Sequence, residues 1–217
     1  MSISLDGPCM LPDENKVKNI VLFLHGYGAN GNDLISLSSF WKDLAADTAF
    51  YSPNAPFKCD FGADSFQWFE LMNRDEKEMK QGLKKAGPLL NNYIDELLLK
   101  HKISEKKLII VGFSQGTIMA LYHMCKRKNS CGGILGYSGM LFDDENYKKS
   151  IESKYPIFLY HGKNDNVISY ESSIFAESKL KEYGFDVTCK IQDQLDHGID
   201  ENGLIEGKKF LDKILAI

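Results

Sequence analysis

A serine with glycines two positions before and two positions after it is the clearest chemical signal in this sequence. It lies in the run Gly112-Phe113-Ser114-Gln115-Gly116. The mostly apolar residues 107–111 are typical of a buried strand, and residues 117–122 begin a helical pattern. Between a strand and a helix, G-x-S-x-G makes a sharp turn that exposes the serine hydroxyl, because glycines remove side chains that would clash. Such a serine is suited to attack a carbonyl carbon and accept an acyl group.

Ser114 needs a general base, because a serine hydroxyl is a weak nucleophile until an adjacent group takes its proton. Where a serine elbow belongs to a catalytic triad, the chain order is Ser, then Asp or Glu, then His. Four histidines come too early in the chain or lie within the helix after the elbow: His25, His101, His123 and His161. The fifth, His197, lies in the loop between the last expected strand and the last expected helix. The order therefore favours His197 as the base over an ordinary exposed histidine.

The acid that orients this base is predicted at Asp165. It follows the expected strand 157–160, within Asn164-Asp165-Asn166, so its carboxylate would lie at a strand end. The same residues have the composition of a turn, which is the alternative explanation for an aspartate there. Four other aspartates fit less well, because they come too early in the order of strands or too close to the histidine: Asp143, Asp144, Asp193 and Asp196.

Acyl transfer also needs backbone N–H groups aimed at the oxygen that becomes negatively charged. One is the amide of Gln115, directly after the serine and at the positive end of the expected helix. The second is predicted at Tyr27, because an apolar strand runs into His25-Gly26-Tyr27-Gly28, where glycines let the backbone approach a bound carbonyl. The side chains of Tyr27 and His25 are expected to hold this loop. A phosphate-binding loop is the weaker alternative, since the spacing and lysine of a P-loop are missing.

These residues must be positioned by strands and helices that alternate along the chain. Short apolar runs predict strands at 19–24, 49–52, 107–111, 133–137, 157–160 and 187–191. Helical patterns occupy 33–47, 75–100, 117–128, 169–183 and 203–215. The second of these helices is expected to be interrupted near Gly87-Pro88, because proline lacks a backbone donor. The alternation predicts an α/β fold with a mostly parallel central sheet and helices on both faces, in one domain spanning residues 1–217.

Composition argues against several classes of function. The 217 residues are 43% hydrophobic and carry a net charge of −4 with acids and bases mixed, so no nucleic acid partner is expected. No secretory signal is visible at the N-terminus, and the apolar runs are too short for stable membrane insertion. The cysteines lack the spacing of a disulfide framework or a zinc site: Cys9, Cys59, Cys125, Cys131 and Cys189. These features predict a cytoplasmic protein with no bound metal.

The motifs taken together resemble the phospholipase/carboxylesterase family, which includes acyl-protein thioesterases. The matching stretches are Leu24-His25-Gly26-Tyr27-Gly28, Pro53-Asn54-Ala55-Pro56, Trp68-Phe69, Gly112-Phe113-Ser114-Gln115-Gly116, Ser138-Gly139, His161-Gly162 with Asp165, and His197. The resemblance implies an α/β-hydrolase fold without a large cap domain, and a serine hydrolase that cleaves small acyl esters or thioesters. It places the catalytic residues at Ser114, Asp165 and His197 and the oxyanion amides at Tyr27 and Gln115. It implies no cofactor and is compatible with a homodimer.

The pocket for the acyl group is predicted from apolar residues near the ends of two strands. The aromatic stretch 61–72 and the residues after the strand 133–137 predict an acyl pocket that includes Trp68, Phe69, Met140 and Leu141. Ordinary core packing is the alternative for each of them. Without a cap the site would be open, which favours short to medium acyl esters. A lysophospholipase, an acyl-protein thioesterase acting as a depalmitoylase, and an idle hydrolase fold that only binds stay open as alternatives.

Overall fold

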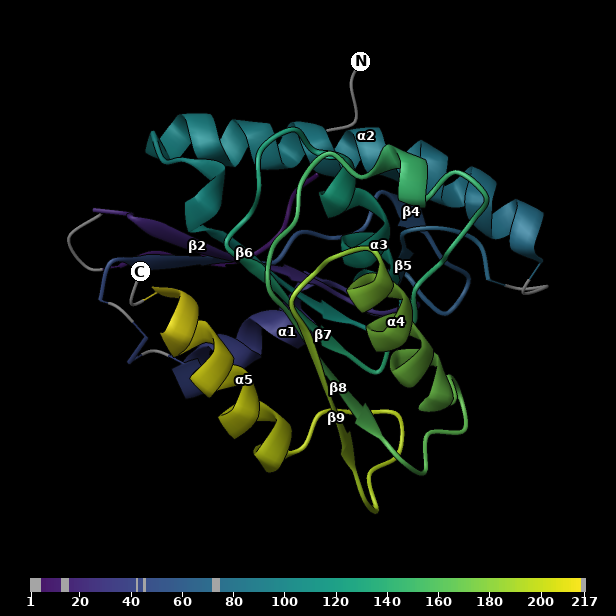
Figure 1. Cartoon of the computed structure of the whole chain (residues 1–217). Helices are drawn as coiled ribbons and strands as arrows, with labels where there is room; N and C mark the ends of the chain where they lie inside the picture. Colours follow the sequence, from purple (N-terminus) through teal and green to yellow (C-terminus); the bar gives the residue numbers. More distant parts are fainter. Residues whose placement is uncertain (1–4, 13–15, 42, 45, 72–74, 216–217) are drawn as a thin grey trace.

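Seven strands form the central sheet of the computed structural model, which describes residues 5–12, 16–41, 43–44, 46–71 and 75–215 (Figure 1). In spatial order they are β1 (Cys9–Met10), β3 (Thr48–Tyr51), β2 (Asn19–Leu24), β6 (Leu108–Phe113), β7 (Gly133–Tyr137), β8 (Ile157–Gly162) and β9 (Val187–Gln192). β1 pairs antiparallel with β3, and the other neighbouring pairs are parallel. The predicted mostly parallel sheet is confirmed.

Helices cover both faces of this sheet, as Figure 1 shows. On one face lie α2 (Glu76–His101), α3 (Gln115–His123) and α4 (Glu171–Glu182). On the other lie α1 (Gly31–Ile35) and α5 (Glu201–Leu215). A separate small hairpin joins β4 (Phe57–Lys58) to β5 (Phe66–Gln67). Among the described helices, none has both the length and the apolarity needed to cross a membrane.

The central strands are continuously apolar because each strand buries both of its faces. In β2, Ile20, Leu22 and Leu24 pack into the hydrophobic cluster under α2 and α3. Val21 and Phe23 pack into the cluster under α5. Successive side chains in a strand point to opposite faces, so a six-residue buried run serves two cores at once.

The first predicted helix is wrong in length. The α-helix ends at Ile35 and continues as the 3₁₀ helix Ser36–Trp41, rather than as one helix over 33–47. Serine hydroxyls explain the change of geometry, because Ser38 Oγ donates to Ile35 O at 2.5 Å and Ser39 Oγ donates to Ser36 O at 2.7 Å. Such side-chain bonds to nearby carbonyls compete with regular α-helical bonding.

The predicted interruption of the long helix at Gly87-Pro88 is also wrong, since α2 runs without a break through Pro88. Packing against α3 holds the helix together there. The ring of His123 lies against Gly87, where an added Cβ would be 2.2 Å from Cε1 of the imidazole. His123 Nε2 also lies 2.8 Å from Leu83 O, to which it donates. Tertiary contacts of this kind can override the local preference against proline, although that preference amounts to about 3 kcal/mol in a helix interior.

The free energy of unfolding is expected to fall as the pH falls below about 6.5. Burial lowers the pKa of His123 to about 3, whereas the unfolded chain takes up a proton on this ring at about pH 6.5. Burial also lowers the pKa of His25, His101 and His161. Each ring therefore contributes full stability above about pH 6.5, and the contribution is lost as the pH falls towards the folded-state pKa.

Urea unfolding of the wild type and His123→Gln at pH 7.5 and pH 5 measures this effect. Glutamine can donate to Leu83 O but does not titrate, so the variant is expected to lose less stability between the two pH values. Equal losses in the two proteins would contradict the role assigned to His123.

Candidate active site

Ser114 lies at the sharp turn between β6 and α3. Its backbone has φ 52° and ψ −115°, a conformation that residues with side chains rarely adopt. A Cβ on Gly116 would lie 1.8 Å from the carbonyl oxygen of Leu24, and one on Gly112 would lie 2.6 Å from Thr117 Cα. The two glycines of the motif are therefore required by close backbone approach. The turn presents the serine at the carboxyl end of a central strand and at the N-terminus of a helix.

Asp165 and His197 form a hydrogen-bonded pair next to this turn. His197 Nδ1 lies 2.6 Å from Asp165 Oδ2, and the side chain of Asp165 is fully buried. The other carboxylate oxygen, Oδ1, accepts from the backbone N–H groups of Val167 at 2.8 Å and Ile168 at 2.9 Å. Burial by itself would raise the pKa of Asp165, but the hydrogen bonds from His197 and the two amides outweigh it and lower that pKa. Asp165 is therefore a carboxylate at neutral pH.

Tight packing between two loops brings His197 to Asp165. A Cβ on Gly162 would lie 2.2 Å from Leu195 O and 2.4 Å from Asp196 O. The N–H of Asn164 donates to Leu195 O at 2.9 Å. The loop after β9, which carries His197, therefore lies directly on the end of β8, and Asp165 follows three residues after that end.

Gly162→Ala is expected to lower kcat/KM by about 10²-fold, because a displacement of about 1 Å in a catalytic group has an effect of this size. The new methyl group must push residues 195–196 away and carry His197 with them. Gly198→Ala is the matched control, since a Cβ at this position meets nothing within 4 Å. Steady-state hydrolysis of an activated ester by both variants measures the effect. Similar rates for the two would contradict this packing argument.

The two amides predicted to bind an oxyanion border the same cavity as Ser114 and His197. Tyr27 and Gln115 both line it. The N–H of Gln115 is the first of helix α3 and has no partner within the helix. Across the described residues, no acceptor takes up the N–H of Tyr27 or Gln115, and no hydrogen bond joins Ser114 to His197. Both amides are therefore free to bind a ligand.

Side chains behind the cavity hold in place the two segments that carry the amides of Tyr27 and Gln115. His25 Nε2 accepts from the N–H of Ala55 at 2.9 Å, so Nδ1 carries the proton and donates to Gly26 O at 2.7 Å. Burial lowers the pKa of His25, which keeps the ring neutral in this role. The side chain of Gln115 accepts from Trp68 N–H and donates to Phe69 O, each at 2.7 Å.

The cavity beside Ser114 has a volume of about 700 Å³. Its wall is mostly apolar and includes Leu71, Met79, Ile118 and Met140. Of the four predicted pocket residues, Met140 lines this cavity. Trp68 and Leu141 lie in the hydrophobic core, where they are at most 3% exposed.

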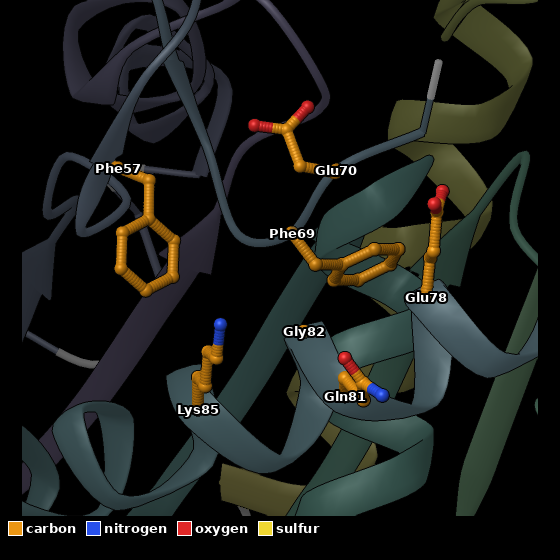
Figure 2. A pocket seen from close by; sticks show the side chains of 7 residues that line it. All are labelled: Phe57, Phe69, Glu70, Glu78, Gln81, Gly82 and Lys85. Atoms are coloured by element: carbon orange, nitrogen blue, oxygen red, sulfur yellow. The ribbon is translucent and has the colours of Figure 1, made fainter. Parts of the chain in front are cut away.

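Phe69, the remaining predicted pocket residue, borders a different cavity (Figure 2). This second cavity, of about 480 Å³, lies between α2 and the β4–β5 hairpin. Figure 2 shows the ring of Phe69 over Gly82, with Phe57, Glu70 and Lys85 around the opening. Phe69 is also buried in the hydrophobic core, with 1% of its surface exposed.

His161 is a site residue to which the sequence assigned no function. It lies at the end of β8 and is fully buried, with Nε2 at 3.0 Å from Asp165 Oδ2. Its position four residues before Asp165, in a strand followed by a turn, is the signal that could have indicated it.

Among the described residues, no group of three or more His, Cys, Asp or Glu side chains is placed to hold a metal.

The parallel sheet and the serine at its strand–helix turn are those of the α/β-hydrolase fold. The chain belongs to the phospholipase/carboxylesterase family, whose model matches residues 6–215.

Individual relatives are similar over nearly their whole length. Acyl-protein thioesterase 1 of Emericella nidulans is 27% identical, and the match covers 96% of this chain and 95% of that protein. Among solved structures, the esterase PE8 is 34% identical with a TM-score of 0.93, over 98% of this chain and 100% of that chain. The Bacillus cereus carboxylesterase, at 19% identity and a TM-score of 0.77 over 97% of this chain and 94% of that one, shares the fold.

Proposed function

We propose that this protein hydrolyses carboxylic esters or thioesters by transferring the acyl group first to Ser114 and then to water. The observation that carries this proposal is the Asp165–His197 hydrogen bond of 2.6 Å, formed where His197 and Ser114 border one cavity. Relatives named esterase and acyl-protein thioesterase support the same chemistry.

Asp165 fixes the tautomer of His197 in this scheme. Because Nδ1–H donates to the carboxylate, Nε2 is the nitrogen that is free to accept a proton. As Ser114 Oγ bonds to the carbonyl carbon, its proton passes to Nε2 and the carbonyl π electrons move to the oxygen. The N–H groups of Tyr27 and Gln115 stabilise that negative charge, and each such donor typically contributes about 10²–10³ in rate.

The remaining steps use the same groups in reverse. The C–O or C–S bond to the leaving group breaks, and the leaving group takes the proton from Nε2. Water then attacks the acyl-enzyme, gives one proton to His197 and forms the carboxylic acid as Ser114 Oγ leaves and regains its proton. This sequence requires no metal and no organic cofactor.

Thioester cleavage on acylated proteins, a depalmitoylase activity, is the second candidate. The cavity beside Ser114 favours it, because its mostly apolar wall suits an acyl chain. The relative named acyl-protein thioesterase 1 supports it as well. Rates measured on matched oxyesters and thioesters across a series of acyl lengths distinguish the candidates. A maximum at short to medium oxyesters is the expected result, whereas a maximum at long thioesters would favour the second candidate.

Labelling with a fluorophosphonate probe, followed by mapping of the adduct, tests the proposal directly. A single adduct on Ser114 is expected, and it should disappear in Ser114→Ala. Ser172→Ala is the control, because Ser172 lines the same cavity but lies outside the proposed catalytic groups. Folded protein that neither labels nor hydrolyses any ester would indicate a hydrolase fold used only for binding.

A further inference from the structure

One oxygen of Asp165 lies within hydrogen-bond distance of two imidazole rings. Oδ2 is 2.6 Å from Nδ1 of His197 and 3.0 Å from Nε2 of His161. The other oxygen is already occupied by two backbone N–H groups. The orientation of the carboxylate therefore depends on His161 as well as on the base that it serves.

The surroundings of His161 determine which of its nitrogens carries a proton. Nε2 lies near two acceptors, Asp165 Oδ2 at 3.0 Å and Ile168 O at 2.9 Å, so it must be the donor. Nδ1 lies 2.7 Å from Ser173 Oγ on α4. Ser173 Oγ also lies 3.3 Å from Gly139 O, and its single proton can serve only one of these two partners. The shorter contact assigns that proton to Nδ1 of His161.

A neutral ring is consistent with its burial. Removal from water lowers the pKa of His161, although its hydrogen bonds to Ile168 and Asp165 oppose this. The titratable groups that face it are Asp165 and His197, with Glu171 of α4 acting at longer range. His161 is thus a neutral N–H donor held at both ends, by Ser173 and by the carboxylate.

We infer that His161 is a positioning residue for the proposed triad: it binds the same oxygen of Asp165 as His197 does and limits how strongly that oxygen attracts a proton on His197. The effect of His161 on kinetics rests on the proposed function, whereas its hydrogen bond to Asp165 does not. A second N–H donor on Oδ2 withdraws negative charge from the carboxylate. Without it, Asp165 would stabilise the imidazolium form of His197 more strongly, and the base would lose its proton only at higher pH.

The comparison of His161→Leu with His161→Gln tests the inference. Leucine removes the donor, whereas the amide nitrogen of glutamine replaces Nε2 and does not titrate. In His161→Leu the acid limb of the pH profile of kcat/KM is expected to move up by roughly one pH unit, the effect of losing one hydrogen bond to a charged group. In His161→Gln the limb is expected to stay within about 0.3 unit of the wild type.

Titration of the His197 ring by NMR gives a second readout that does not require turnover. The same upward shift is expected in His161→Leu, with rescue in His161→Gln. The inference would be overturned if, in His161→Leu, the acid limb of the pH profile and the titration of the His197 ring coincide with those of the wild type or move to lower pH. If His161→Leu does not fold, Ser173→Ala provides the test, because loss of its bond to Nδ1 should move both readouts upward by a smaller amount.

The two proposals fail in different ways. A wild type that neither hydrolyses esters nor labels at Ser114 refutes the proposed function, while the NMR titration still decides whether His161 acts on His197. An active wild type with unchanged profiles in His161→Leu refutes only the inference.

Discussion

Replacing Ser114 by alanine is expected to lower kcat/KM for ester hydrolysis by about 10⁴- to 10⁶-fold, because it removes the atom that would form the bond to the acyl group. The residual rate would come from substrate binding and from the free amides of Tyr27 and Gln115, which do not depend on the serine hydroxyl. Alanine is as unfavourable as serine at φ 52°, so the strain at the elbow is unchanged. The loss can therefore be attributed to chemistry rather than to a relaxed turn.

Three measurements make this result interpretable. Steady-state rates on an activated ester give the loss, and urea unfolding shows whether Ser114→Ala stays folded. Ser172→Ala, on the wall of the same cavity, is expected to stay within about threefold of the wild type. A Ser114→Ala protein that is folded and keeps most of its activity would refute the proposed mechanism.

Asp165→Asn is expected to lower kcat by about 10⁴-fold, the size seen when a triad acid is replaced by its amide. The structure gives the reason. Because Oδ1 accepts from two backbone N–H groups, the amide oxygen of asparagine must occupy that side. The NH₂ group then replaces Oδ2 and faces Nδ1 of His197, which has to become an acceptor. The proton moves to Nε2, where it blocks the transfer from Ser114.

Asp193→Asn is the matched control for this change. Asp193 lies near the base in sequence, but its carboxylate is exposed and pairs with Lys163 at the surface. Its amide variant is expected to stay within about twofold of the wild type, since exposed pairs contribute little. Near wild-type kcat in Asp165→Asn would show that the acid of the site lies elsewhere.

The sequence predicts most of the fold because local pattern and long-range packing agree there. The buried run of β2 and the glycines around Ser114 each have one physical explanation, so residue type alone identifies them. The uninterrupted passage of α2 through Pro88 could not be predicted in this way. It depends on His123, a residue of another helix that packs against Gly87.

The candidate site shows the same difference between features set by local sequence pattern and features set by long-range packing. The strand–turn–helix pattern at Ser114 and the order of Asp165 and His197 can be found from the sequence, because the chemistry requires those residue types and the α/β-hydrolase fold presents them in that order. The second imidazole on Asp165 and the position of Phe69 outside the cavity are set by side-chain packing. Periodicity carries no information about which of several buried aromatic residues faces a cavity.

The proposed nucleophile, Ser114, lies far before the proposed base, His197, along the chain. Ser114 directly follows β6, whereas His197 lies just before α5. That last helix is held by Trp41, whose indole N–H donates to Leu204 O at 3.1 Å. A chain that folds as it is made would therefore hold the proposed nucleophile before the proposed base, and the proposed chemistry requires the segment up to His197 to be in place.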